Sequence, residues 1–182
     1  MHSHKDMEII TYIRQGAITH EDSLGNKGVT RAGEIQVMSA GTGITHSEYN
    51  YEVKETLLFQ IWIQPERNNL KPRWENVDIN LNKKMGVNIL ASGQKGKMDK
   101  GNITIYQDTT LYFITGDQTH SANFSLINNR HIYLVVSKGD VIINDIMVNN
   151  RDGAYINDEQ KLEFIFQGES EIILLDLPKQ ST

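Results

Sequence analysis

The sequence opens on "HSHKDMEII", residues 2–10, in which two histidines stand two positions apart. Side chains of a β-strand alternate between its two faces, so His2 and His4 share a face, and Glu8 has the same parity. A histidine pair this close to a first residue is also typical of an expression tag or a solvated terminus. The stretch therefore predicts a strand with one chemically active face only if a second set of ligands lies opposite it.

A second pair of the same spacing, His46 and Glu48, lies in "GTGITHSEYN", residues 41–50. On a facing strand of a small barrel this pair would meet His2 and His4. Three imidazoles and one carboxylate would then converge on one point. The glycines of this stretch could suggest a phosphate-binding loop, but no Lys-Ser/Thr follows them, and we interpret them as a tight turn.

The donor set narrows the kind of metal. The chain has no cysteine, so disulfides and thiolate sites are excluded. Imidazole with one carboxylate suits Fe, Mn, Ni, Cu or Zn better than Mg or Ca, which prefer oxygen ligands. Four protein ligands leave positions open on a five- or six-coordinate ion, where a substrate or dioxygen could bind.

Composition limits the other functions. The net charge of the 182 residues is −5, which argues against a nucleic-acid partner. No apolar run approaches the roughly 18 residues that a membrane helix needs, and no signal peptide is visible. We therefore expect a cytoplasmic protein with no membrane partner.

The pattern along the chain predicts β-structure. Short apolar runs alternate with Gly-rich turns at a spacing typical of sandwiches and barrels, and no long amphipathic helix is predicted. We expect a first domain over residues 1–65, ending at Pro65. The polar stretch 66–100 is interpreted as a linker with one strand, "MGVNILAS", and a second β domain follows over residues 101–182.

A weak internal repeat relates the two halves. Gly16 matches Gly139 at an offset of 123, and Gly33 matches Gly153 at an offset of 120. The repeat predicts two copies of one small barrel. The same offsets carry the four candidate ligands onto residues without metal-binding side chains, so we expect no metal in the second copy; these residues are Ser125, Ile127, Phe166 and Gly168.

The remaining histidines have no partner that the sequence reveals. His20, His120 and His131 lie outside both pairs and are interpreted as structural.

The motif spacing resembles a known fold family. His2-x-His4-x-x-x-Glu8, two later glycines and Gly43-x-x-His46-x-x-x-Asn50 resemble the two cupin motifs. Among cupins, "HSHKDMEIITYI", "HEDSLGNKG" and "MSAGTGITHSEYN" resemble the pirin family, above all the bacterial pirin-like proteins that act as quercetin 2,3-dioxygenases. The likeness continues through "LFQIWIQPE" to "LLDLP". The sequence departs from the commonest cupin pattern in one glycine spacing and in "RAG", where many cupins have Pro-x-Gly.

The resemblance implies an all-β double cupin of two antiparallel β-barrel or jelly-roll domains, with a single metal in the first. It implies that His2, His4, His46 and Glu48 are the ligands, and that Glu8 lies beside them. Fe(II) is the favoured ion, with Mn, Ni, Cu or Zn as alternatives. The second cupin of this family lacks a metal.

The implied activity is the opening of the central ring of a flavonol by dioxygen, with Glu48 as ligand or general base. The alternative is a non-catalytic metal-binding protein that regulates a partner protein by binding to it. Eukaryotic pirins look like regulators of this kind. Family members carry further strands before the His-x-His motif. We therefore expect an incomplete first cupin of doubtful activity that self-associates, whereas full-length relatives are monomeric.

Overall fold

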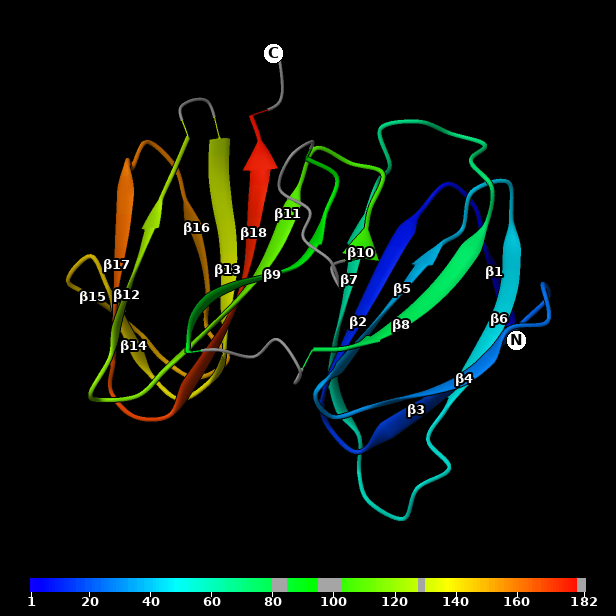
Figure 1. Ribbon diagram of the computed structural model, residues 1–182, viewed down its shortest axis with the longest axis horizontal. Helices are drawn as coiled ribbons and strands as arrows, with labels where there is room; N and C mark the ends of the chain where they lie inside the picture. The colour runs from blue at the N-terminus through cyan, green and yellow to red at the C-terminus, as the bar shows by residue number, and fades with distance from the viewer. Residues whose placement is uncertain (80–84, 95–102, 128–129, 180–182) are drawn as a thin grey trace. The chain divides into compact units, whose positions relative to one another are not determined.

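The computed structural model describes residues 1–79, 85–94, 103–127 and 130–179. Within these ranges every helix or strand assigned is a β-strand, as Figure 1 shows, and the all-β prediction is confirmed. A search of the same residues for a helix long and apolar enough to cross a membrane finds none.

The chain divides into two compact units. The first comprises residues 1–81 and 99–107, and the second comprises residues 82–98 and 108–182. Each unit is built from antiparallel sheets whose strands come from distant parts of its sequence.

The stretch 66–100 differs from its interpretation as a linker with one strand. It contributes β8 (Arg73–Asp78) to the first unit and β9 (Gly86–Ser92) to the second. Residues of β8 are mostly half-buried, and the strand pairs with β5 (Glu34–Ser39) of the first unit. Its polar sequence therefore gave no sign that it forms a strand. Residues 80–84 and 95–100 of this stretch lie outside the described ranges.

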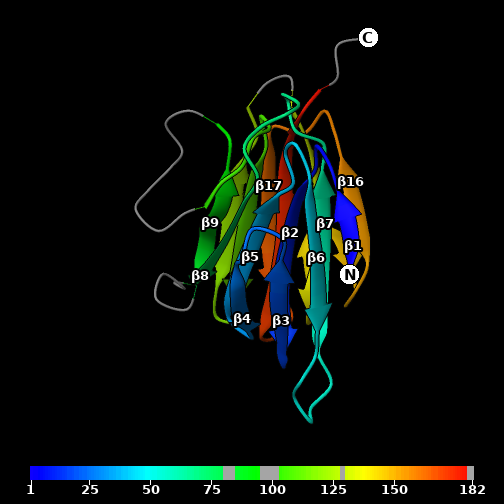
Figure 2. The same ribbon diagram turned by 90° about the vertical axis from the view of Figure 1, so that its right-hand side faces the viewer.

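The first unit has two four-stranded sheets. Figure 2 shows one of them in front, with strands of the other behind it. The front sheet has the order β1 (His2–His4), β6 (Ile44–Tyr49), β3 (Ala17–Asp22), β4 (Lys27–Arg31). The other has the order β7 (Leu57–Ile63), β2 (Glu8–Gln15), β5 (Glu34–Ser39), β8. The short strand β10 (Ile103–Thr104) also belongs to this unit.

The second unit repeats this strand order. Its smaller sheet runs β12 (Ser121–Ser125), β17 (Lys161–Phe166), β14 (Val141–Ile143), β15 (Ile146–Val148). Its larger sheet includes, in order, β9, β11 (Thr110–Gly116), β18 (Ser170–Pro178), β13 (Arg130–Lys138), β16 (Gly153–Ile156). Thus β18 corresponds to β7, and β18 has neighbours on both sides whereas β7 ends its sheet.

Two glycines mark the same bend in each copy. Gly16 and Gly139 have φ values of +75° and +72°, a region that L-residues with a side chain seldom adopt. A Cβ on Gly16 would lie 2.8 Å from Thr56 Oγ1, and one on Gly139 would lie 2.3 Å from Ser170 Oγ. The backbone conformation and the crowding hydroxyl therefore recur together.

The hydrogen bonds of these hydroxyls also recur. Thr56 donates to the carbonyl of Ala17 at 2.8 Å, and Ser170 donates to that of Asp140 at 3.2 Å. Both acceptors directly follow the glycines. The ladders of β2 with β7 and of β13 with β18 each shift register just before the glycine. These details support the predicted duplication.

The register shows what replaces the candidate site in the second copy. In the first unit His20 lies opposite Glu48, and in the second Ile143 lies opposite Phe164. Ile143 and Phe164 belong to the apolar core of the second unit. The same scaffold therefore encloses polar residues in one copy and hydrocarbon in the other.

The pairing of the first strand gives the same result. His2 lies opposite His46 in the first unit, and Phe124 lies opposite Leu162 in the second. The structural counterparts of the candidate ligands thus differ from the residues that a constant sequence offset indicates. For His46 and Glu48 the offset fails because fewer residues connect β14 to β17 than connect β3 to β6.

Replacement of Gly16 by alanine tests the bend. Gly25 has φ +86° but nothing within 4 Å of an added Cβ, so Gly25→Ala should cost only backbone strain, about 1 kcal/mol. Gly16→Ala adds a steric clash and should cost at least about twice as much. Urea unfolding of both variants measures the difference. Equal losses of unfolding free energy would show that the close approach of Thr56 does not constrain the bend.

Candidate metal centre

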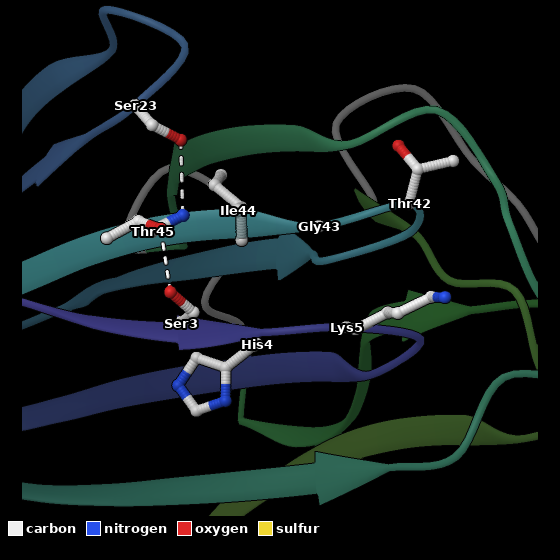
Figure 3. Close-up of a pocket in the computed structure, with 8 residues that line it drawn as sticks. All are labelled: Ser3, His4, Lys5, Ser23, Thr42, Gly43, Ile44 and Thr45. Carbon is white, nitrogen blue, oxygen red and sulfur yellow. Dashed lines mark hydrogen bonds between the residues drawn. The ribbon is translucent and has the colours of Figure 1, made fainter.

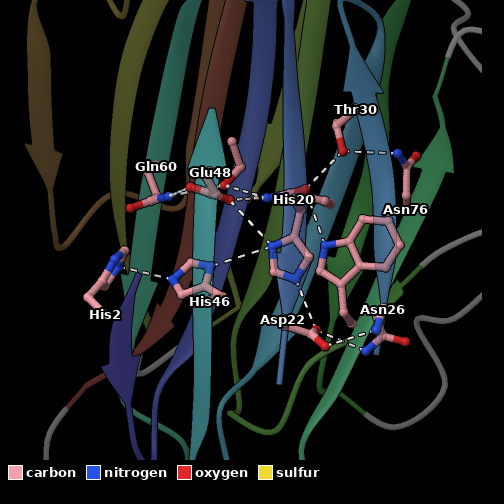
Figure 4. Close-up of polar contacts among 12 residues, drawn as sticks. His2, His20, Asp22, Asn26, Thr30, His46, Glu48, Gln60 and Asn76 are labelled. Atoms are coloured by element: carbon pink, nitrogen blue, oxygen red, sulfur yellow. Dashed lines mark hydrogen bonds and ion pairs between the residues drawn. The ribbon is translucent and has the colours of Figure 1, made fainter. Parts of the chain in front are cut away.

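Three histidines from two neighbouring strands form one cluster. His2 of β1 pairs with His46 of β6, and their Nε2 atoms are 3.0 Å apart (Figure 4). The ring of His4 lies 4.7 Å from that of His2 and 5.0 Å from that of His46, centre to centre. One nitrogen of each ring lies within 4.8 Å of the others. Because metal–nitrogen bonds are about 2.0–2.1 Å long, a single ion fits between them.

The surroundings favour the neutral form of His4 and His46. Burial and the nearby histidines, first among them His2, lower the pKa of His46 to about 4. Burial, with the charge of His2, also lowers the pKa of His4. Metal ions bind the unprotonated imidazole, so His4 and His46 are held in the form that binds a metal near neutral pH.

Glu48 lies on the same face of β6 as His46 but belongs to a second group. Its carboxylate can join a three-residue set with His20 and His46, whose ligand atoms lie within 4.8 Å of one another. The structure thus divides the four predicted ligands between two groups that share His46. Figure 4 shows Glu48 directed toward Gln60 and His20.

Two amides hold the carboxylate of Glu48. Gln60 donates its Nε2 hydrogen to Oε2 at 3.0 Å, and Gln36 donates to Oε1. The Gln36 carbonyl accepts from the Thr30 hydroxyl at 2.9 Å and from Trp74 Nε1 at 3.2 Å. Since two donors fix that oxygen, the amide nitrogen of Gln36 must face Glu48. The carboxylate is therefore held in place by two N–H donors.

His20 is a residue whose role sequence reasoning missed. It is fully buried, its Nε2 lies 3.0 Å from Asp22 Oδ2, and its Nδ1 lies 3.4 Å from Nδ1 of His46. Its ring stacks on Trp74 at 5.0 Å with an interplanar angle of 9°. The interpretation of His20 as a histidine without partners was wrong. The spacing His20-x-Asp22, which places both side chains on one strand face, could have revealed it.

Other predicted positions lie outside both groups. Glu8 is buried and accepts the Ser39 hydroxyl at 2.9 Å, and burial raises its pKa. In the second unit, His120 bonds to Asp117 in an exposed turn. His131 also belongs to that unit.

A surface pocket of about 330 Å³ borders β1 and β6 (Figure 3). Its lining includes His4 but not His2, His46 or Glu48. The lining residues Ser3 and Thr45, which bond to each other at 2.7 Å, alternate with the histidines and face the opposite side of the sheet. The pocket therefore touches the histidine cluster through His4 alone of its three members.

Comparison with known proteins matches both halves. Family models described as Pirin and as Quercetinase C-terminal cupin domain match residues 1–63 and 89–177. The chain is 42% identical to a pirin-like protein of Caulobacter vibrioides, over 96% of this chain and 75% of that protein. It is 40% identical to quercetin 2,3-dioxygenase of Escherichia coli, over 97% of this chain and 75% of that protein.

Solved structures agree with these matches. The crystal structure of YhhW from Escherichia coli superposes with a TM-score of 0.90 at 39% identity, covering 100% of this chain and 76% of that one. YhhW in complex with nickel(II) superposes with a TM-score of 0.89 at 39% identity, covering 98% and 76% of the two chains. The predicted double cupin is confirmed, and the chain belongs to the pirin family.

Proposed function

We propose that this chain is a metal-dependent dioxygenase of the quercetin 2,3-dioxygenase type. Its substrate would be a flavonol, whose central ring is opened by dioxygen with release of carbon monoxide. The observation that carries the proposal is the cluster of His2, His4 and His46 with the carboxyl group of Glu48 beside it. The activity named for the Escherichia coli relative supports the reaction class.

The proposed ligands are the three histidines and Glu48. Nitrogen donors with one carboxylate suit a divalent transition ion, and we favour Fe(II), with Mn, Ni, Cu or Zn as alternatives. A bound ion would supply Lewis acidity toward the 3-hydroxyl and 4-oxo oxygens of a flavonol. The structure of YhhW in complex with nickel(II) supports a metal-dependent function for a member of this family.

The protein's own groups handle the proton. Glu48 would accept the proton of the flavonol 3-hydroxyl at a carboxylate oxygen. The amides of Gln36 and Gln60 both donate to this carboxylate in the structure, so they hold it facing the interior. Protonation of a carboxylate oxygen would weaken the hydrogen bond that this oxygen accepts from one of the amides.

An aromatic surface lies beside the cluster. The ring of Trp62 is 4.9 Å from that of His4, edge-on, and 53% of this residue is exposed. Its Nε1 donates to Gln60 Oε1 at 2.9 Å, which fixes the plane of the indole. A fixed, half-exposed indole is suited to contact a flat aromatic ring, which supports a flavonol-like substrate.

His46→Ala should abolish metal retention, because this imidazole belongs to both groups. Metal analysis after dialysis against Fe²⁺ or Ni²⁺ measures it, with circular dichroism to verify folding. His4→Ala, which removes a less buried ring, should weaken retention as well. His120→Ala removes an exposed imidazole of the second unit and serves as the control. Retention by His46→Ala equal to that of the parent would exclude this centre.

Glu48→Gln should lower aerobic quercetin consumption and carbon monoxide release by roughly 10²–10⁴-fold at equal metal content, because it removes the base. The control Glu52→Gln makes the same change at an exposed carboxylate bonded to Arg31. Unchanged turnover in Glu48→Gln with the metal still bound would remove Glu48 from proton transfer. A parent that binds metal but never consumes quercetin would favour the regulatory alternative.

A further inference from the structure

We propose that Asp22 and His20 are positioning residues that fix the tautomer of His46. The three side chains form a line of hydrogen bonds that ends at the histidine cluster, as Figure 4 shows. The inference concerns the direction in which each ring nitrogen carries its hydrogen. Its effect on metal affinity rests on the proposed metal function, whereas the tautomer itself can be measured without metal.

Asp22 is an acceptor that the turn after β3 holds in place. Its Oδ1 accepts the backbone N–H groups of Leu24 at 2.9 Å and Asn26 at 3.0 Å. Its Oδ2 accepts Nδ2 of Asn26 at 2.9 Å and faces Nε2 of His20 at 3.0 Å. Burial opposes ionisation, but the hydrogen bonds from His20 and Asn26 outweigh it and lower the pKa of Asp22. An ionised carboxylate only accepts, so Nε2 of His20 carries the hydrogen.

The hydrogen on Nε2 determines whether the other ring nitrogen of His20 donates or accepts a hydrogen bond. In a neutral ring Nδ1 is then an acceptor, and its partner at 3.4 Å is Nδ1 of His46. Glu48 Oε1 is farther from the same nitrogen, at 4.0 Å. His46 must therefore carry its hydrogen on Nδ1. Its Nε2 is left with a free electron pair, directed at His2.

Packing prevents His20 from turning. Trp74 stacks on its ring, and the indole is itself held by its hydrogen bond to Gln36. Gly28 leaves the space for this indole, since a Cβ at that position would lie 2.3 Å from Trp74 Cη2. The orientation of the imidazole is thus set by contacts on its face and its edge. Partners of this kind orient metal-binding histidines, and their loss typically costs about 10–100-fold in affinity.

The line of hydrogen bonds from Asp22 through His20 to His46 is called the relay below. Asp22→Asn tests the relay because the turn determines which way the new amide group is oriented. The two backbone N–H groups require the amide oxygen, so the NH₂ group must occupy the place of Oδ2, and the amide of Asn26, which donates to Oδ2 in the parent, must turn to present its oxygen. The new NH₂ group would donate to Nε2 of His20 and move the hydrogen of that ring to Nδ1. His46 would then carry its hydrogen on Nε2. Two-bond ¹⁵N–¹H NMR of the metal-free chain should show both tautomers exchanged.

The affinity for Ni²⁺, measured by competition with a chelator, should fall about 10–100-fold in Asp22→Asn. Glu21→Gln makes the same charge change one residue away, at an exposed carboxylate bonded to Lys27, and should change neither measurement. An Asp22→Asn chain with parental tautomers and parental Ni²⁺ affinity would overturn the relay. A parent that binds no Ni²⁺ at His46 would instead overturn the metal function, and the tautomers would still decide the relay.

A second pair of variants covers the case in which Asp22→Asn does not fold. Leucine and asparagine have similar shapes, but only asparagine offers an acceptor near the position of Nδ1. His20→Asn should therefore retain more Ni²⁺ affinity than His20→Leu, and should keep the parental tautomer of His46. Equal affinities and equal tautomers in the two variants would contradict the relay, because they would leave only the volume of His20 as its contribution.

Discussion

The short antiparallel ladder between β1 and β6 is the interaction on which the candidate centre depends. It sets His2 opposite His46 and places the side chains of His2, His4 and His46 on one face of the sheet. Side chains alternate with a period of two, so a slip of one residue would direct His2 and His4 outward and dissolve the cluster. The contact of Ser3 with Thr45 on the opposite face of the same ladder opposes such a slip. Three residues of β1 thus carry two of the proposed ligands.

The two units show what a cupin scaffold pays for chemistry. The second fills its interior with apolar side chains, whereas the first buries His20, Gln36 and Thr30 at the corresponding depth. Buried polar groups are costly unless they are bonded. Among the described residues, the buried side-chain atoms without a partner are Gln94 Nε2 and Thr109 Oγ1, both in the second unit. The polar interior of the first unit is therefore satisfied in itself.

The sequence carried enough information for the fold class and for the two same-face pairs of candidate ligands, because strand alternation and motif spacing are local signals. It gave a poor account of β8, whose residues are polar and half-buried. It also missed the relay. His20 stands close to Asp22 in the sequence, but Trp74 and Gln36 come from strands that only the fold brings near.

The sequence failed to predict the orientation of Glu48 for the same reason, because the contacts that fix it come from distant strands. Its pairing with His46 was readable from the i, i+2 spacing, but the amides that turn it toward His20 lie on β5 and β7. A constant offset between the two copies failed for a related reason, since insertions between strands change the numbering without changing the register. Long-range pairing therefore decides what local patterns leave open.

The placement of the aromatic side chains has an optical consequence. The chain contains two tryptophans, and each lies against a histidine of the candidate centre: Trp62 edge-on to His4 and Trp74 face-to-face with His20. Indole emission responds to charge and to transition ions a few ångströms away. All of the tryptophan fluorescence of this protein therefore originates beside the site, from one indole at the cluster and one at the buried relay.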